Sequence, residues 1–160
     1  MGIKFTAGDI VEMGLQIEKN GREYYKEVGK CSSSGKARAI FDFLGKEEIQ
    51  HINYFEKLLE KTEKEEIAES YPGEYHEYMQ HLSGLHVFTQ EGKGKEAACK
   101  IKGDLEALQT AAGFEKDSIL FYYEMRNFIA EKDKHIIDGI IKQEQLHLSK
   151  IMELVNAMNH

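Results

Sequence analysis

Proline is nearly absent from this chain of 160 residues, which contains one proline, no tryptophan and two cysteines. Proline interrupts helices, and the sequence is well supplied with glutamate, lysine, leucine, isoleucine and alanine, so the composition favours long helices. The cysteines, Cys31 and Cys99, lie far apart and form no Cys-x-x-Cys pair. Their spacing therefore argues against a disulfide framework or a zinc ribbon.

Long apolar runs and an excess of positive charge are also missing. No apolar stretch approaches the length that spans a membrane, and the N-terminus lacks the apolar core of a secretory signal. The net charge is -7, whereas a surface for nucleic acid or an anionic membrane needs clustered positive charge. We therefore expect a cytoplasmic protein with neither kind of partner, folded as one domain over residues 1–160.

Apolar residues recur at three- and four-residue spacing in four segments, which predicts four amphipathic helices. Thr6 and Asp9 have the form of a capping box before the first helix, and Asp104 is expected to cap the third. The predicted fold is all-α, an antiparallel four-helix bundle made of two helical hairpins joined by one long crossover. The expected helices cover approximately residues 7–29, 35–62, 104–129 and 132–157.

The expected crossover, residues 62–94, is the least regular part of the chain, and short helices are predicted around 74–83. It carries three histidines spaced by five residues, His76, His81 and His86. Five residues on a helix rotate by about 500°, so successive histidines do not share a face. We therefore expect no metal cluster here, but polar packing of the crossover or a subunit interface.

The motif Glu-x-x-His occurs twice, as Glu48–His51 and as Glu144–His147, and each copy interrupts the apolar stripe of its helix. Residues three apart on a helix are neighbours on one face. The carboxylate and the imidazole can therefore reach the same metal ion, or the carboxylate can bridge two ions. One copy of so short a motif is close to chance expectation, so its significance depends on the rest of the pattern.

An internal repeat supplies that pattern. When residues 10–28 are aligned with 107–125, Glu18 matches Glu115 and the pair Tyr24-Tyr25 matches Phe121-Tyr122. A carboxylate on an apolar stripe is unusual, because a buried and unpaired charge is costly. Either these groups are satisfied polar residues of the core or the two halves build one two-metal site. We favour the metal site, whose ligands would be Glu18, Glu48, His51, Glu115, Glu144 and His147.

Two tyrosines follow the single carboxylates at the same offset. Tyr25 and Tyr122 lie seven residues after Glu18 and Glu115, two turns along approximately the same helix face. They could hydrogen-bond a ligand carboxylate, or quench oxidising equivalents at a catalytic site. The reading that they are ordinary aromatic residues of the core remains equally open.

Four segments together resemble the rubrerythrin-like proteins of the ferritin-like superfamily, and the resemblance covers nearly the whole chain. It implies a four-helix bundle with a non-haem di-iron centre, to which two helices give one Glu each and two give Glu-x-x-His. By this resemblance Glu48 and Glu144 would bridge the irons, Glu18 and His51 would serve one iron, and Glu115 and His147 the other. The segments are Glu18-Lys19-x-Gly21-x-x-Tyr24-Tyr25, Glu47-Glu48-x-x-His51, Phe114-Glu115-Lys116-Asp117-Ser118-Ile119-x-Phe121-Tyr122 and Glu144-x-x-His147.

The sequence departs from rubrerythrins in two ways. It lacks the cysteine pairs of a rubredoxin domain, so electrons would come from a separate donor such as a rubredoxin-like protein. Ser118 stands where rubrerythrins carry an additional carboxylate, so the iron movement linked to that ligand is not implied here.

We therefore expect a di-iron oxidoreductase that reduces hydrogen peroxide or dioxygen and forms a homodimer. Its cofactors would be two iron ions, although carboxylate and imidazole ligands also suit manganese and zinc. Two alternatives are an iron-binding, ferroxidase or iron-storage protein, and a structural helical protein whose site is vestigial or filled by zinc.

Overall fold

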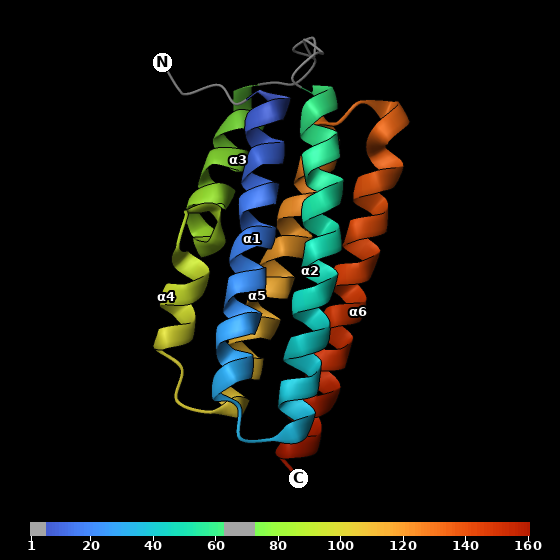
Figure 1. The fold of residues 1–160 in the computed structure, drawn as a ribbon. Helices are drawn as coiled ribbons and strands as arrows, with labels where there is room; N and C mark the ends of the chain where they lie inside the picture. Colours follow the sequence, from blue (N-terminus) through green and yellow to red (C-terminus); the bar gives the residue numbers. More distant parts are fainter. Residues whose placement is uncertain (1–5, 63–72) are drawn as a thin grey trace.

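Four long helices run side by side in the computed structural model (Figure 1). The structure describes residues 6–62 and 73–160, except for the side chains of residues 73–76 and 87. Neighbours in sequence pack as two antiparallel hairpins, and the crossover makes α5 parallel to α2. This arrangement and the helix bounds confirm the predicted all-α bundle of two hairpins. The helices are α1 (Ala7–Cys31), α2 (Gly35–Thr62), α5 (Asp104–Met125) and α6 (Lys134–Met158).

The beginning of α1 forms as the sequence predicts. Thr6 Oγ1 accepts a hydrogen bond from the amide of Asp9, and the Asp9 carboxylate accepts one from the amide of Thr6. This capping box satisfies amide groups that the first turn of a helix leaves without partners.

The prediction that Asp104 caps the third helix is wrong. Gly103 holds the cap position with a φ of 147°, and Asp104 is the first helical residue. Its carboxylate instead accepts hydrogen bonds from the amide of Ser34 (2.7 Å) and the hydroxyl of Ser33 (3.1 Å). Amide groups near the start of α2 need acceptors too, so this side chain joins the two hairpins.

The third helix is also shorter than predicted, because α5 ends at Met125 and not near residue 129. Two short 3-10 turns, η2 (Arg126–Phe128) and η3 (Glu131–Asp133), turn the chain into α6. Arg126 donates to both carboxylate oxygens of Asp138 on α6, at 2.6 and 3.1 Å. The contact closes the α5–α6 hairpin at this end.

The described part of the crossover consists of α3 (Gly73–Leu85), η1 (Val87–Thr89) and α4 (Lys93–Cys99) (Figure 1). Of these, η1 and α4 pack against α1. The short helix expected near 74–83 is confirmed as α3. The sequence analysis did not predict α4. No described helix is sufficiently long and apolar to cross a membrane.

One buried side chain of α1 holds this crossover in place. Asn20 Nδ2 donates to the carbonyl groups of Phe88 and Gln90, both at 2.7 Å, and its Oδ1 accepts from the amide of Gly94 at 3.0 Å. A Cβ atom at Gly94 would lie 2.0 Å from the carbonyl oxygen of Asn20, so this approach requires glycine. Asn20 therefore fixes the crossover to α1 at a point only two residues after Glu18.

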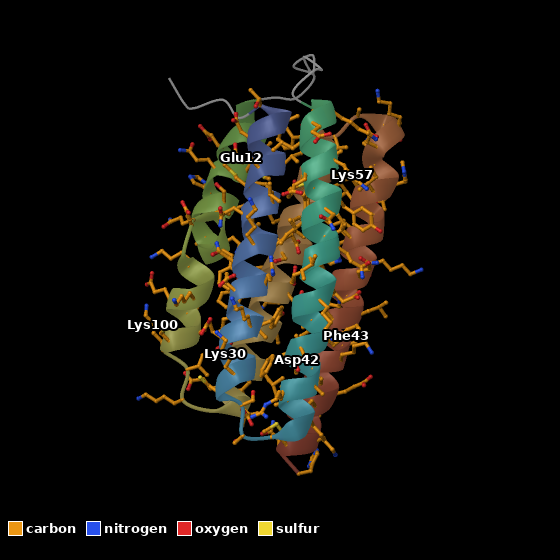
Figure 2. All side chains as sticks on the ribbon, in the orientation of Figure 1. Glu12, Lys30, Asp42, Phe43, Lys57 and Lys100 are labelled. Carbon is orange, nitrogen blue, oxygen red and sulfur yellow. The ribbon has the colours of Figure 1, made fainter. Side chains whose placement is uncertain are left out.

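The histidines of the crossover have different environments. The side chain of His76 lies outside the described residues, His81 is exposed, and His86 is buried at 2 % exposure. Within the described ranges, neither His81 nor His86 belongs to a cluster of possible metal ligands. Charged side chains cover the outside of the bundle, among them Glu12, Lys57 and Lys100 (Figure 2).

We predict that Asn20→Ala lowers the free energy of unfolding by about 3 kcal/mol, because it leaves two buried and one partly buried backbone group without their side-chain partner. Urea unfolding followed by circular dichroism measures the change. Asn53→Ala, at an exposed position of α2, is the matched control and should change stability by less than about 0.5 kcal/mol. Equal effects of the two substitutions would contradict the proposed anchoring role of Asn20.

Candidate metal centre

Six polar side chains meet in the middle of the bundle, and none of them is more than 4 % exposed. Each lies on the inward stripe of its helix, between apolar residues that pack in the core. A Cβ atom at Gly21 would lie 3.3 Å from the Glu48 carboxyl group, so Gly21 leaves room for that group against α1. The six are Glu18 on α1, Glu48 and His51 on α2, Glu115 on α5, and Glu144 and His147 on α6.

These side chains form two overlapping groups. In each group, one possible ligand atom from every residue lies within 4.8 Å of the others. Glu48 and Glu144 belong to both groups; Glu18 and His51 complete the first, and Glu115 and His147 the second. The structure thus brings together all six residues predicted from the sequence, in the grouping that the resemblance implies, while their role as ligands remains a proposal.

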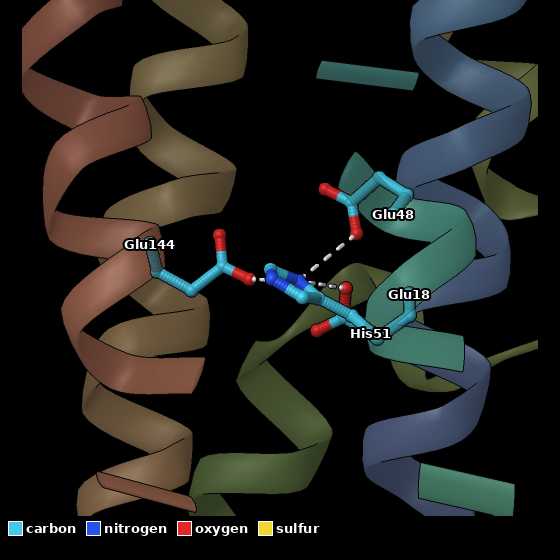
Figure 3. A group of neighbouring side chains, drawn as sticks. All are labelled: Glu18, Glu48, His51 and Glu144. Carbon is cyan, nitrogen blue, oxygen red and sulfur yellow. Dashed lines mark hydrogen bonds and ion pairs between the residues drawn. The ribbon is translucent and has the colours of Figure 1, made fainter. Parts of the chain in front are cut away.

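His51 is oriented with one ring nitrogen among the carboxylates (Figure 3). Its Nδ1 lies 2.8 Å from Glu144 Oε1, 3.1 Å from Glu18 Oε2 and 3.7 Å from Glu48 Oε2. Its Nε2 lies 2.6 Å from Gln143 Oε1, which can only accept, so Nε2 carries a hydrogen atom. Holding one nitrogen as a donor and directing the other at oxygen ligands is how proteins prepare a histidine for a metal ion.

His147 has the corresponding position in the second group. Its Nδ1 lies 3.1 Å from Glu144 Oε2 and 3.9 Å from Glu115 Oε1, and its Nε2 lies 3.9 Å from Glu47 Oε2. The sequence analysis gave no role to Glu47 or Gln143. Each stands one residue before the Glu of its motif and faces the histidine of the other hairpin. Glu47 and Gln143 occupy matching positions in the internal repeat, and this match is the sequence signal that could have identified them as neighbours of the cluster.

The two predicted tyrosines cross between the hairpins. Tyr25 on α1 donates a hydrogen bond to Glu115 Oε1 on α5, and Tyr122 on α5 donates one to Glu18 Oε1 on α1. Burial, and then the nearby carboxylates, raise the pKa of both phenols, so both remain donors. Each tyrosine therefore orients a carboxylate of the cluster, in addition to filling the core.

Protons compensate part of the negative charge of the cluster. Burial and then Glu18 raise the pKa of Glu48, and burial and then Glu144 raise that of Glu115. Burial opposes charge on His51 as well, but Glu18 and Glu144 raise its pKa. Glu18 is the exception: burial raises its pKa, but His51, Glu48 and Tyr122 bring it down to about 2.

Two carboxylate oxygens show that protons alone do not satisfy the cluster. Glu48 Oε2 and Glu144 Oε1 are buried and have no hydrogen-bond partner among the described residues, although His51 Nδ1 lies 3.7 Å from the first and 2.8 Å from the second. Buried polar atoms without partners are costly and uncommon in proteins. Both atoms belong to the residues shared by the two groups, where a bridging ligand of two cations would lie. The residues present therefore fit a pair of metal ions.

A small cavity lies against the cluster. Its volume is about 10 Å³, which is room for one water molecule. All four carboxylates of the cluster line it, together with Tyr25, Phe88, Phe114 and Ser118, but neither histidine does. The cavity is thus next to the carboxylate side of the cluster.

We predict that Glu48→Gln stabilises the metal-free protein at pH 7. The pKa of Glu48 is raised above its ordinary value of 4.5, so the protein loses stability as the pH rises from 4.5 toward the folded-state pKa. Glutamine does not titrate and avoids that loss. The melting temperature should rise on the order of 5 °C at pH 7, and the difference should vanish near pH 4.5.

Calorimetry of the metal-free proteins across this pH range measures the effect. Glu56→Gln, at an exposed position of α2, is the control and should match the wild type. A Glu48→Gln protein that is less stable than the wild type at pH 7 would contradict the electrostatic account of the cluster.

Comparison with solved structures relates this arrangement to a known fold. A crystal structure of a Thermotoga maritima protein, provisionally described as a ferritin-like diiron-carboxylate protein, matches over 98 % of both chains. The TM-score is 0.70 and the sequence identity is 22 %. No family model and no curated protein matches the chain. At this identity the comparison establishes the fold, and the chain therefore has the ferritin-like helical fold.

Proposed function

We propose that this chain is a non-haem di-iron carboxylate protein that reduces hydrogen peroxide or dioxygen with electrons from a separate donor. The observation that carries the proposal is the pair of buried four-residue groups that share Glu48 and Glu144. Carboxylate and imidazole ligands in this ratio suit iron, and the described residues hold the cluster away from solvent. The shared fold of the Thermotoga maritima protein, which is described as diiron, agrees with this assignment.

The roles of the residues follow from their places in the two groups. Glu48 and Glu144 would bridge two iron ions, Glu18 and His51 would hold one ion, and Glu115 and His147 the other. When bound, a pair of ferrous ions supplies the two electrons that, with two protons, convert hydrogen peroxide to two water molecules. Tyr25 and Tyr122 keep the terminal carboxylates in place, and the apolar residues around the cluster exclude bulk water.

A cationic groove on the outer face of α1 and α2 supports a proposal for the electron donor. The groove has a volume of about 580 Å³, and Lys30 and Asp42 mark its position in Figure 2. On a protein of net charge -7, this concentration of cations suits an acidic partner, such as a rubredoxin-like protein. Five cations, Arg22, Lys26, Lys30, Arg38 and Lys46, line it together with one acid, Asp42.

The floor of this groove lies close to the cluster. Phe41 lines the groove and stacks on Tyr25 with ring centroids 6.2 Å apart, and the Tyr25 hydroxyl reaches Glu115. A donor docked here would therefore be separated from the cluster by two aromatic side chains.

We predict that the diferrous protein consumes hydrogen peroxide rapidly in stopped-flow measurements, and that Glu48→Ala with Glu144→Ala lowers the rate at least tenfold, because both shared ligands are lost. The control pair, Glu56→Ala with Glu153→Ala, removes exposed acids from the same two helices and should leave the rate unchanged. A wild type no faster than the Glu48 and Glu144 double variant would contradict the enzyme assignment.

The same preparation separates the alternative functions. Iron storage requires a large hollow assembly, whereas the proposed enzyme is a homodimer, and light scattering distinguishes the two. Zinc in place of iron after anaerobic purification would favour a structural protein with a zinc-filled site.

We predict that Lys26→Glu with Lys46→Glu slows reduction of the protein by reduced rubredoxin about tenfold at low ionic strength, with the difference shrinking as salt is added. The control, Lys57→Glu with Lys100→Glu, makes the same charge change away from the groove and should have a much smaller effect. Equal slowing by both pairs would show that net charge, and not this groove, governs the encounter.

A further inference from the structure

We propose that Ser118 is a hydrogen-bond donor to the small oxygen or nitrogen ligand that enters the cavity beside the cluster, and that His86 is the positioning residue that directs its hydroxyl group. The inference rests on the proposed function, since it assigns a role in ligand binding at the same metal centre. It connects the crossover, through one buried histidine, to that centre.

The hydrogen bonds of His86 fix which of its nitrogens carries the hydrogen atom. The amide of Phe88 donates to His86 Nδ1 at 3.3 Å, so Nδ1 is an acceptor. In a neutral imidazole the hydrogen then lies on Nε2, which is 3.1 Å from Ser118 Oγ. His86 therefore donates to the serine oxygen. Burial lowers the pKa of His86 to about 4, which keeps the ring neutral near pH 7.

Aromatic neighbours hold the ring of His86 in this orientation. It stacks on Phe88 with centroids 6.1 Å apart and meets the edge of Phe121 at 6.3 Å. The imidazole therefore has little freedom to turn and reverse the direction of the hydrogen bonds. The backbone amide of Phe88 thus determines, through His86, the direction of the hydrogen bond between His86 and Ser118.

Because Ser118 Oγ accepts from His86, the hydrogen atom of its own hydroxyl remains to be donated. No other hydrogen-bond partner of this hydroxyl is found in the described ranges 6–62 and 73–160, and Ser118 lines the cavity. The hydroxyl hydrogen is thus available to whatever occupies the cavity.

The other polar groups around the cavity do not offer such a hydrogen atom. The four carboxylates would be acceptors only once they hold metal ions, and the hydroxyl of Tyr25 already donates to Glu115. An anionic ligand in this cavity would otherwise meet mainly negative oxygens. Ser118 supplies the compensating donor.

Azide is a suitable probe, because it is a small anion that binds ferric centres and changes their absorption. We would load the full-length chain with iron, oxidise it, and titrate azide into the wild type and the variants. Ser118→Ala should weaken azide binding about tenfold, whereas Ser118→Thr keeps the hydroxyl and should stay within about twofold of the wild type.

Variants of His86 test the positioning role. His86→Leu removes the donor to Ser118 and should weaken azide binding as much as Ser118→Ala does. His86→Gln places an amide N–H near the position of Nε2 and should restore most of the affinity. Combined with Ser118→Ala, His86→Leu should cause little additional loss, because the two residues act through one hydrogen bond.

Iron content, measured on every sample, separates this inference from the proposed function. A wild type that binds no metal overturns both proposals. A Ser118→Ala protein that holds two irons and binds azide as tightly as the wild type overturns this inference alone. A second result would also overturn this inference: His86→Leu loses azide affinity while Ser118→Ala does not. In that case His86 would not act through its hydrogen bond to Ser118.

Discussion

Mutual repulsion of four carboxylates in the middle of a helical bundle is the constraint on which the rest of the structure depends. Glu18, Glu48, Glu115 and Glu144 are each at most 4 % exposed and belong to two overlapping groups, within each of which possible ligand atoms lie within 4.8 Å of one another. Such groups are strongly destabilising unless positive charge compensates them. Protons and His51 supply part of that compensation, but two carboxylate oxygens still have no hydrogen-bond partner in the part of the chain that the structure describes. A pair of divalent cations is the compensation that this arrangement fits.

The hairpins support each other's part of the cluster. Tyr25 of the first hairpin holds Glu115 of the second, and Tyr122 of the second holds Glu18 of the first. Gln143 and His51 form a further link of this kind. Neither hairpin can therefore orient its own ligands alone, so the geometry depends on the complete bundle. Sites whose ligands are fixed in this way need little rearrangement on metal binding.

The helices and the six cluster residues could be predicted because both follow a regular spacing in the sequence. Apolar residues at three- and four-residue spacing mark the inward face of a helix, and any Glu or His on that face must lie in the interior. The internal repeat then paired Glu18 with Glu115 and Glu48 with Glu144. These inferences needed only local spacing and a comparison of the chain with itself.

Contacts between segments that are distant in the chain produce no regular spacing in the sequence, and the sequence analysis did not predict them. Asp104 has the form of a helix cap, yet its carboxylate serves Ser33 and Ser34, about seventy residues away. The crossover histidines look alike in the sequence, but Asn20 holds the segment so that His86 reaches Ser118. Tertiary packing decided both outcomes.

The most direct test of the central claim is iron anomalous scattering from crystals of protein loaded anaerobically with ferrous iron. The account predicts two peaks for each chain, one beside His51 and one beside His147, with Glu48 and Glu144 between them. A map with no peak at the cluster, or with a single ion, would contradict it.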